Sequence, residues 1–143
     1  PSPLPLVVQI IPERTHLDPS VSPLEALLTH EQPGTRVVVI ETNASDDAFA
    51  DLEVQCQSED VLVLAVVARP AAWRRFGLPE HVRLTLNRIM QQTETHLVVL
   101  GDPGVAQDLP HHTSVLYTSS DTPVTQEAAG AWLLAQGRLQ RRA

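Results

Sequence analysis

Three acidic residues follow predicted strands at the points where those strands end: Glu41, Asp102 and Asp121. Carboxylates gathered at one edge of a parallel sheet could hold a divalent cation or act as an acid/base pair. A local explanation competes with this one. Asp102 stands directly before a proline and Asp121 stands two residues before one, which is typical of turn and helix-cap residues. We favour the local explanation, and we expect neither a metal site nor a cofactor.

Charge excludes several classes of function. All ten basic residues are arginine and the formal net charge is −7. Without lysine the chain cannot form a Schiff base or a P-loop, and a phospho-receiver domain would also need one. No basic cluster is present, so we expect no nucleic-acid partner.

Glycine is missing where an anion-binding fold needs it. The segment after the first predicted strand, residues 11–16, holds no glycine and carries an acid. A dinucleotide or phosphate site at this loop is therefore excluded, because backbone could not approach the anion. Gly101 and Gly104 follow a later strand, where we expect a tight turn.

Cysteine and histidine offer little further chemistry. Cys56 is the only cysteine, and it falls late on the inner face of a predicted helix, which indicates an inert thiol rather than a nucleophile. His111 and His112 are adjacent, whereas helical metal ligands are usually three or four residues apart. We expect this pair to lie in a solvated loop.

One loop combines residue types that are common in interfaces. Residues 69–78 follow the most apolar strand and include Arg69, Trp73, Arg74, Arg75 and Phe76. Aromatic residues and arginine dominate interaction hot spots. We interpret these five residues as an interface or as the rim of a substrate pocket. Trp73 and Phe76 could instead fold under the sheet edge as core.

The elements that position these residues alternate between strand and helix. Apolar runs predict strands at residues 6–11, 36–40, 61–68, 96–100 and 114–117. Helical periodicity and cap residues predict helices at 23–32, 45–57, 79–93 and from 123 to about 136. This pattern favours an α/β three-layer sandwich with a mostly parallel five-stranded sheet, helices on both faces, and the flavodoxin-like strand order 2-1-3-4-5.

Each predicted helix carries one face of similar side chains. These faces hold Leu24, Leu27 and Leu28; Phe49, Leu52 and Cys56; Val82, Leu86, Ile89 and Met90; and Val124, Ala128, Ala131, Trp132 and Ala135. With 43% hydrophobic and only 3% aromatic residues, the core must be aliphatic.

The length of 143 residues fits one domain. We expect a linker remnant at residues 1–5, a single domain at 6–137 and a tail at 138–143. The sequence starts at a proline, so we expect a processed chain or an excised piece. The longest apolar run, residues 61–68, is far shorter than the roughly 20 residues of a membrane helix, which predicts a soluble protein that could be cytoplasmic or secreted.

The second half of the chain resembles a known family. The segments His96-Leu-Val-Val-Leu-Gly-Asp-Pro, Asp108-Leu-Pro, Val115-Leu-Tyr, Ser120-Asp-Thr-Pro and Gln126-Glu-Ala-Ala resemble the end of the C-terminal α/β domain of family 3 glycoside hydrolases. The bacterial β-N-acetylhexosaminidase branch is the most similar.

The resemblance implies a domain that packs against an N-terminal catalytic barrel of the same polypeptide. It also implies that carbohydrate substrate is bound only by the full-length parent protein, and not by this domain alone. The β-glucosidase branch delivers a catalytic glutamate from the loop after the third strand. Here that loop begins Arg69-Pro70-Ala71-Ala72-Trp73 and has no carboxylate. The resemblance therefore implies the hexosaminidase branch, whose catalytic Asp and His lie on the barrel, and no catalytic residue in this chain. A stand-alone flavodoxin-like module that binds a small anion or a protein partner is the alternative.

Overall fold

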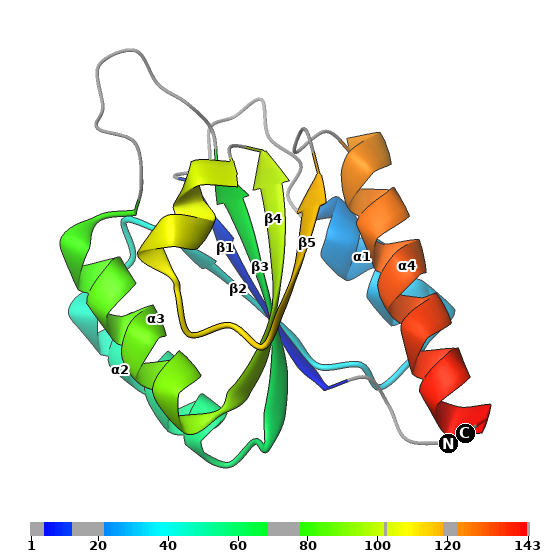
Figure 1. The fold of residues 1–143 in the computed structure, drawn as a ribbon, viewed down its shortest axis with the longest axis horizontal. Helices are drawn as coiled ribbons and strands as arrows, with labels where there is room; N and C mark the ends of the chain where they lie inside the picture. Colours follow the sequence, from blue (N-terminus) through cyan, green and yellow to red (C-terminus); the bar gives the residue numbers. More distant parts are fainter. Residues whose placement is uncertain (1–4, 13–21, 69–77, 102, 119–122, 143) are drawn as a thin grey trace.

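The sheet is parallel and five-stranded, with the strand order β2-β1-β3-β4-β5 (Figure 1). The computed structural model describes residues 5–12, 22–68, 78–101, 103–118 and 123–142. The strands are β1 (Leu6–Ile11), β2 (Val37–Glu41), β3 (Val61–Ala68), β4 (Glu94–Gly101) and β5 (Ser114–Thr118). The helices are α1 (Pro23–Glu31), α2 (Asp46–Gln57), α3 (Glu80–Gln92), the 3-10 helix η1 (Pro103–Asp108) and α4 (Pro123–Arg142). The predicted fold class and strand order are confirmed.

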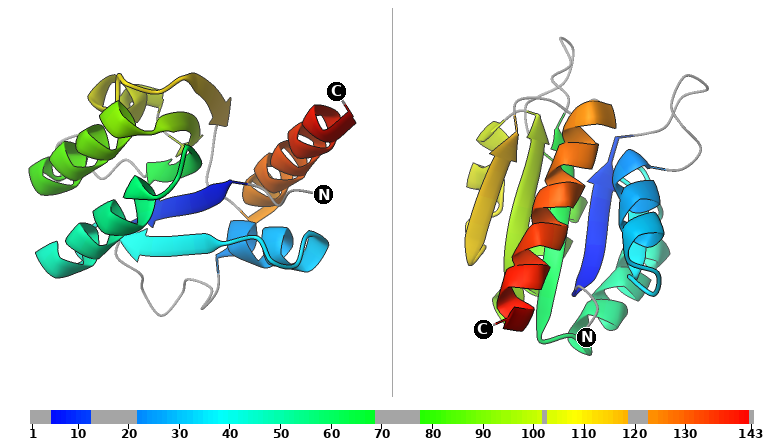
Figure 2. Two further views of the ribbon diagram at one scale, coloured as in Figure 1. Left: turned by 90° about the horizontal axis from the view of Figure 1, so that it is seen from below. Right: turned by 90° about the vertical axis from the view of Figure 1, so that its right-hand side faces the viewer.

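Helices cover both faces of the sheet and create two aliphatic cores. Helices α2, α3 and η1 lie on one face, and α1 and α4 lie on the other (Figure 2). The central strand β3 shows why both faces must be covered, because its side chains point alternately into the two cores. Leu62, Leu64 and Val66 enter the first core, whereas Val63, Ala65 and Val67 enter the second.

Polar caps fix the helix starts as expected. The Ser22 hydroxyl accepts a hydrogen bond from the Glu25 amide, with proline at the first helical position of α1. The Ser45 hydroxyl accepts from the Ala48 amide at the start of α2, over 3.2 Å. Both contacts satisfy amides that have no partner inside their helices. Three of the predicted inner faces are buried as expected, except that Leu27 is only half-buried.

The segment after β4 is more ordered than the predicted tight turn. Gly101 has a φ of +120°, a conformation that glycine adopts without steric cost. The chain then forms η1, whose Val105 and Ala106 are buried in the first core. The Asn87 side-chain amide of α3 donates to the backbone oxygen of Asp108 over 2.9 Å. The apolar pair of η1 explains why this segment packs down instead of turning back at once.

The residues predicted to share one face of α4 are not the ones that the helix buries. Ala128, Ala131, Trp132 and Ala135 do share a face, but that face is exposed. The buried stripe instead consists of Gln126, Ala129, Gly130, Leu133 and Leu134, at the i, i+3, i+4, i+7, i+8 spacing of an amphipathic helix. The side chain of Val124 lies outside the described residues. Leucine pairs gain more from burial than alanine does, so they set the rotation of the helix.

Helix α4 is also longer than predicted, since it continues to Arg142. The expected tail at residues 138–143 therefore begins as further turns of the same helix. The expected linker at residues 1–5 lies almost entirely outside the described residues, and the domain limits remain a prediction.

Candidate functional site

All five strands end at one edge of the sheet, the upper edge in Figure 1, where the sequence predicts a site. Glu41 ends β2 there and is half-exposed. Its backbone oxygen accepts from the Ala44 amide over 3.0 Å, and the next amide, of Thr42, donates to Ile11 over 2.8 Å. The backbone of Glu41 therefore helps to close the turn between β2 and α2, and the role of its carboxylate stays a prediction.

The other two strand-end acids, Asp102 and Asp121, lie outside the described residues. The sheet nevertheless limits how they could meet Glu41. Strands β1 and β3 separate β2 from β4, so the ends of β2 and β4 are about 14 Å apart at the usual strand spacing of 4.7–4.9 Å. Glu41 can share a ligand with either aspartate only if the connecting loops bring it across the sheet edge.

The predicted interface residues Arg69, Trp73, Arg74, Arg75 and Phe76 also lie outside the described residues. The structure does place the two ends of their loop. The loop leaves the sheet after β3, which is its central strand. It returns to α3, whose cap is Pro79. The loop therefore starts at the middle of the carboxyl edge, which is where ligands bind in open α/β sheets.

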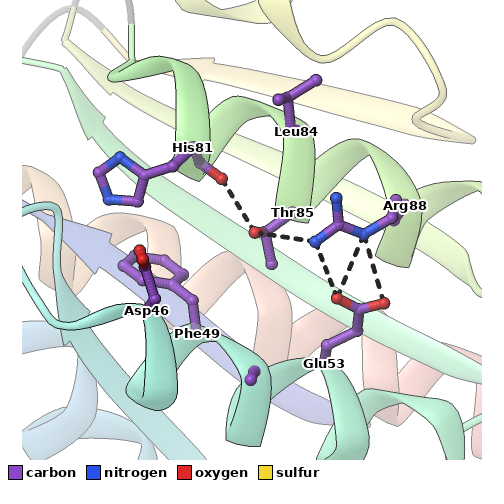
Figure 3. Close-up of a pocket in the computed structure, with 8 residues that line it drawn as sticks. Asp46, Phe49, Glu53, His81, Leu84, Thr85 and Arg88 are labelled. Atoms are coloured by element: carbon purple, nitrogen blue, oxygen red, sulfur yellow. Dashed lines mark hydrogen bonds and ion pairs between the residues drawn. The ribbon is translucent and has the colours of Figure 1, made fainter.

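A hollow of about 280 Å³ lies between α2 and α3 on the solvent side of the two helices (Figure 3). The sequence analysis did not anticipate it. Its lining residues recur along two helices at intervals of three or four positions, which could have indicated a shared groove. They are Asp46, Phe49, Ala50 and Glu53 of α2 and His81, Leu84, Thr85 and Arg88 of α3.

Polar groups in this hollow bind one another. The Arg88 guanidinium donates to the Glu53 carboxylate at 3.1–3.4 Å and to the Thr85 hydroxyl over 3.3 Å. The Thr85 hydroxyl donates to the backbone oxygen of His81 over 2.9 Å. The rings of Phe49 and His81 meet edge to face, with centroids 5.7 Å apart. These contacts join α2 to α3 (Figure 3).

The two acidic residues of the hollow, Asp46 and Glu53, lie on the same helix. They are seven residues apart, which corresponds to about 10.5 Å along the helix axis. The Glu53 carboxylate is already engaged in an ion pair with the Arg88 guanidinium, over 3.1 Å.

Cys56 is buried on the inner face of α2, as predicted. Burial raises the pKa of its thiol to about 11, and the nearby carboxylates of Glu59 and Glu53 act in the same direction. The nucleophilic thiolate is therefore scarce at neutral pH.

The described histidine rings have separate contacts. His111 Nε2 lies 3.2 Å from the Gln91 amide nitrogen, and His112 Nδ1 lies 2.8 Å from the Leu109 backbone oxygen. His96 Nδ1 lies 2.6 Å from the Ser114 hydroxyl. Within the described residues, no three His, Cys, Asp or Glu side chains gather as metal ligands would.

A buried polar cluster links β1 to the starts of α1 and α4. The Gln9 side-chain amide donates to Gln126 Oε1 over 3.1 Å, and the Ser22 hydroxyl donates to Gln9 Oε1. Gln9 is fully buried in an otherwise apolar strand. The lone glutamine in the run of residues 6–11 is the sequence signal for this cluster. These hydrogen bonds hold two helix starts against the sheet.

Comparison with known proteins finds likeness in structure alone. No protein-family model matches the chain, and no curated protein sequence matches it. A family 3 glycoside hydrolase, the β-N-acetylglucosaminidase of Paenibacillus sp. str. FPU-7, aligns over 92% of this chain and 25% of its own, with 14% identity and a TM-score of 0.70. The β-glucoside phosphorylase BglX aligns over 90% of this chain and 23% of its own, with 11% identity and a TM-score of 0.58.

The chain therefore spans about a quarter of the length of these two solved chains and shares the fold of one part of each. A Streptococcus pneumoniae TIGR4 flavodoxin also aligns over 92% of this chain, at 13% identity and a TM-score of 0.47, which is too distant to bear on function. Among the described residues, no helix has both the length and the apolar character needed to cross a membrane.

Proposed function

We propose that this chain is the non-catalytic, C-terminal α/β domain of a two-domain family 3 glycoside hydrolase. One observation supports this most strongly: the fold aligns over 92% of this chain with only 25% of a family 3 β-N-acetylglucosaminidase, at a TM-score of 0.70. A whole enzyme of this kind needs a further, larger part. A catalytic barrel takes about 250 residues, more than the 143 present here.

The chemistry of the described residues agrees with a domain that carries no reacting group of its own. Its thiol is buried, the Glu53 carboxylate of its α2–α3 hollow is paired with Arg88, and Gln9, Ser22 and Gln126 hydrogen-bond to one another. In this proposal the reacting groups lie on the barrel of the same polypeptide, and neither a cofactor nor a metal is required.

Within the family we place the parent in the β-N-acetylhexosaminidase branch, which removes terminal β-linked N-acetylglucosamine in carbohydrate or cell-wall metabolism. The support is the sequence of the loop after β3. Residues 69–77 contain no Asp or Glu, so this loop cannot supply the acid/base glutamate that the β-glucosidase branch takes from the equivalent position.

The same loop is the proposed contact with the barrel. It starts at the middle of the carboxyl edge and carries three arginines and two aromatic residues. Arginine suits a pocket rim because its planar guanidinium makes paired hydrogen bonds, and an aromatic ring supplies apolar area at little entropic cost.

The test is a kinetic comparison in the full-length parent. Arg69→Ala combined with Trp73→Ala is expected to raise KM for an aryl N-acetyl-β-glucosaminide by about fivefold or more, the loss expected when roughly 1 kcal/mol of binding disappears. The value of kcat should change little, because the reacting groups lie elsewhere. The melting temperature of the isolated domain should stay nearly unchanged.

Arg36→Ala is the matched control. Arg36 is an exposed arginine that precedes β2. It therefore lies at the amino ends of the strands, opposite the carboxyl edge, and it pairs with Glu59 there. It should leave KM unaltered. If the double variant instead unfolds the isolated domain and spares the parent's kinetics, the loop is core and the interface proposal is wrong. A natural gene without an upstream barrel would contradict the proposed function and favour a stand-alone binding module.

A further inference from the structure

The acidic charge of this chain is concentrated on one face of the sheet. Helices α2 and α3 together hold five acidic and two basic residues, a formal charge of −3. On the other face, the sequences of α1 and α4 hold three acidic and three basic residues. The exposed acids of the first face are Asp46, Asp47 and Asp51 of α2 and Glu80 of α3. This face therefore attracts a basic partner and repels an acidic one.

Exposed apolar side chains lie among these acids. The described residues include four large hydrophobic side chains that are exposed, and two of them, Val54 at 64% and Leu84 at 44%, lie on α2 and α3. Ala50 is one helical turn before Val54, is also exposed, and lines the α2–α3 hollow together with Leu84. Apolar side chains within a polar rim are typical of a surface that binds another protein.

The hollow has room for one inserted side chain. Its volume of about 280 Å³ lies just below the range of roughly 300–1,000 Å³ that is usual for small-molecule pockets. Its lining reaches from the buried ring of Phe49 out to the exposed side chain of Leu84. Protein interfaces commonly centre on an anchor side chain that fills such a pocket. The dimensions therefore favour a segment of a protein partner over a free metabolite.

The polar groups of the hollow differ in what they have left to bind. The Arg88 guanidinium is engaged by the Glu53 carboxylate and the Thr85 hydroxyl. One to two helical turns away, the Asp46 carboxylate and the His81 ring nitrogens have no hydrogen-bonding partner within the described part of the chain (Figure 3). A free carboxylate accepts hydrogen bonds from a guanidinium or an ammonium group. This end of the hollow is therefore suited to a cationic side chain.

We propose that the outer surface of α2 and α3 binds a basic amphipathic helix of a protein partner. Its apolar side chains lie on Ala50, Val54 and Leu84, and one arginine or lysine enters the hollow beside Asp46. The apolar stem of that side chain can lie along Leu84 while its charged head meets the carboxylate. Surfaces between two helices bind amphipathic helices through anchors of this kind. The proposal is independent of the glycosidase assignment.

The test titrates the 143-residue chain with a synthetic amphipathic helix of about 18 leucine, alanine and arginine residues, and follows the amide chemical shifts by NMR. The amides of Ala50, Val54 and Leu84 should shift. One helix covers less than a standard interface of about 1,600 Å², so the Kd should lie between roughly 10 µM and 1 mM. Added salt should weaken binding, because it screens the attraction between the peptide and the acids. A peptide with lysine for arginine should also bind, whereas one with glutamate should not.

Two variants test the contacts. Asp46→Asn should weaken binding about fivefold or more, because it removes the carboxylate that meets the cation. Leu84→Lys should abolish binding, because it replaces an apolar contact with a repelling charge. Leu84 is exposed, so this variant should keep the wild-type melting temperature. Glu31→Gln is the matched control: it also removes one negative charge, but from α1 on the other face of the sheet, and it should bind like the wild type.

A chain whose amide shifts do not respond to millimolar arginine peptide would overturn the proposal. So would equal binding of the glutamate peptide, shifts confined to α1 and α4, or wild-type affinity in Asp46→Asn or Leu84→Lys. If the amides of Ala50, Val54 and Leu84 shift when the chain alone is concentrated, a second copy occupies this surface, and that result would also contradict a basic partner.

Discussion

At the scale of single residues, Cys56 shows how burial removes a reactive group from use. The thiol sits in the core beneath α2 and α3, and desolvation raises its pKa to about 11. In the unfolded chain a cysteine titrates near 8.5. Because the folded-state pKa is the higher one, folding favours the neutral thiol. That contribution to stability is fully present below about pH 8.5 and is lost as the pH rises through about 11.

We expect Cys56 to resist alkylation in the native chain at pH 8. The thiolate fraction falls on the order of 100-fold when a thiol pKa moves from 8.5 to 11, and burial slows the reaction further. Iodoacetamide labelling followed by mass spectrometry measures this. The same chain in denaturant, which should react at the rate of a free cysteine, is the control. Fast native labelling would show that α2 opens locally.

Stability against alkali gives a second readout of the same residue. The free energy of unfolding of the wild type should fall more steeply than that of Cys56→Ala between about pH 8.5 and 11, because only the wild type has this thiol to ionise.

At the scale of elements, the contact between α1 and α4 depends on a glycine. Gly130 lies in the middle of α4, where glycine costs about 1 kcal/mol of helix stability relative to alanine. A Cβ at this position would lie 2.7 Å from Leu27 Cδ2 and 3.2 Å from Leu24 Cδ1. Close packing of the two helices over the second core therefore compensates for the weak helix former.

Gly130→Val should lower the free energy of unfolding by about 1–3 kcal/mol, the usual cost of forcing extra methyl groups into a packed site. Ala131→Val is the matched control, since it places the same side chain on the exposed face of the same helix and should cost well under 1 kcal/mol. Urea unfolding followed by circular dichroism compares the two. A Gly130→Val variant that is as stable as the wild type, or more stable, would mean that helix propensity, and not packing, decides the effect.

At the scale of the whole molecule, the described elements form one two-sided sheet with a core on each face. Such a unit buries enough apolar surface to fold without a partner. In the proposed function the reacting groups lie on a barrel outside this chain. We therefore expect the isolated chain to fold on its own but to catalyse no hydrolysis.

The isolated 143-residue chain should unfold in one cooperative thermal transition and should hydrolyse no aryl N-acetyl-β-glucosaminide above the rate of a buffer blank. Calorimetry and a chromogenic assay at high protein concentration check the two statements. Turnover that disappears on mutation of one of its own acids, such as Glu41→Gln, would contradict the second.

Much of this fold could be predicted because its signals are local. Continuous β-branched runs indicate strands buried on both faces, and Ser22 and Ser45 mark helix starts through contacts three residues away. Strand order followed from right-handed crossovers and adjacency. The candidate site was harder to predict. The position of Glu41 at a strand end follows from its neighbours in the sequence. The α2–α3 hollow depends on how far apart two helices pack, which the sequence pattern does not give.

The amino-acid sequence by itself determined the fold class, the strand order and the exclusions that follow from missing lysine and missing loop glycine, because these depend on short-range pattern and composition. Only the tertiary structure decided which face of α4 is buried, that η1 packs into the core, and that Gln9 meets Ser22 and Gln126. Those outcomes depend on contacts between residues far apart in the chain, where packing against neighbouring elements outweighs local preference.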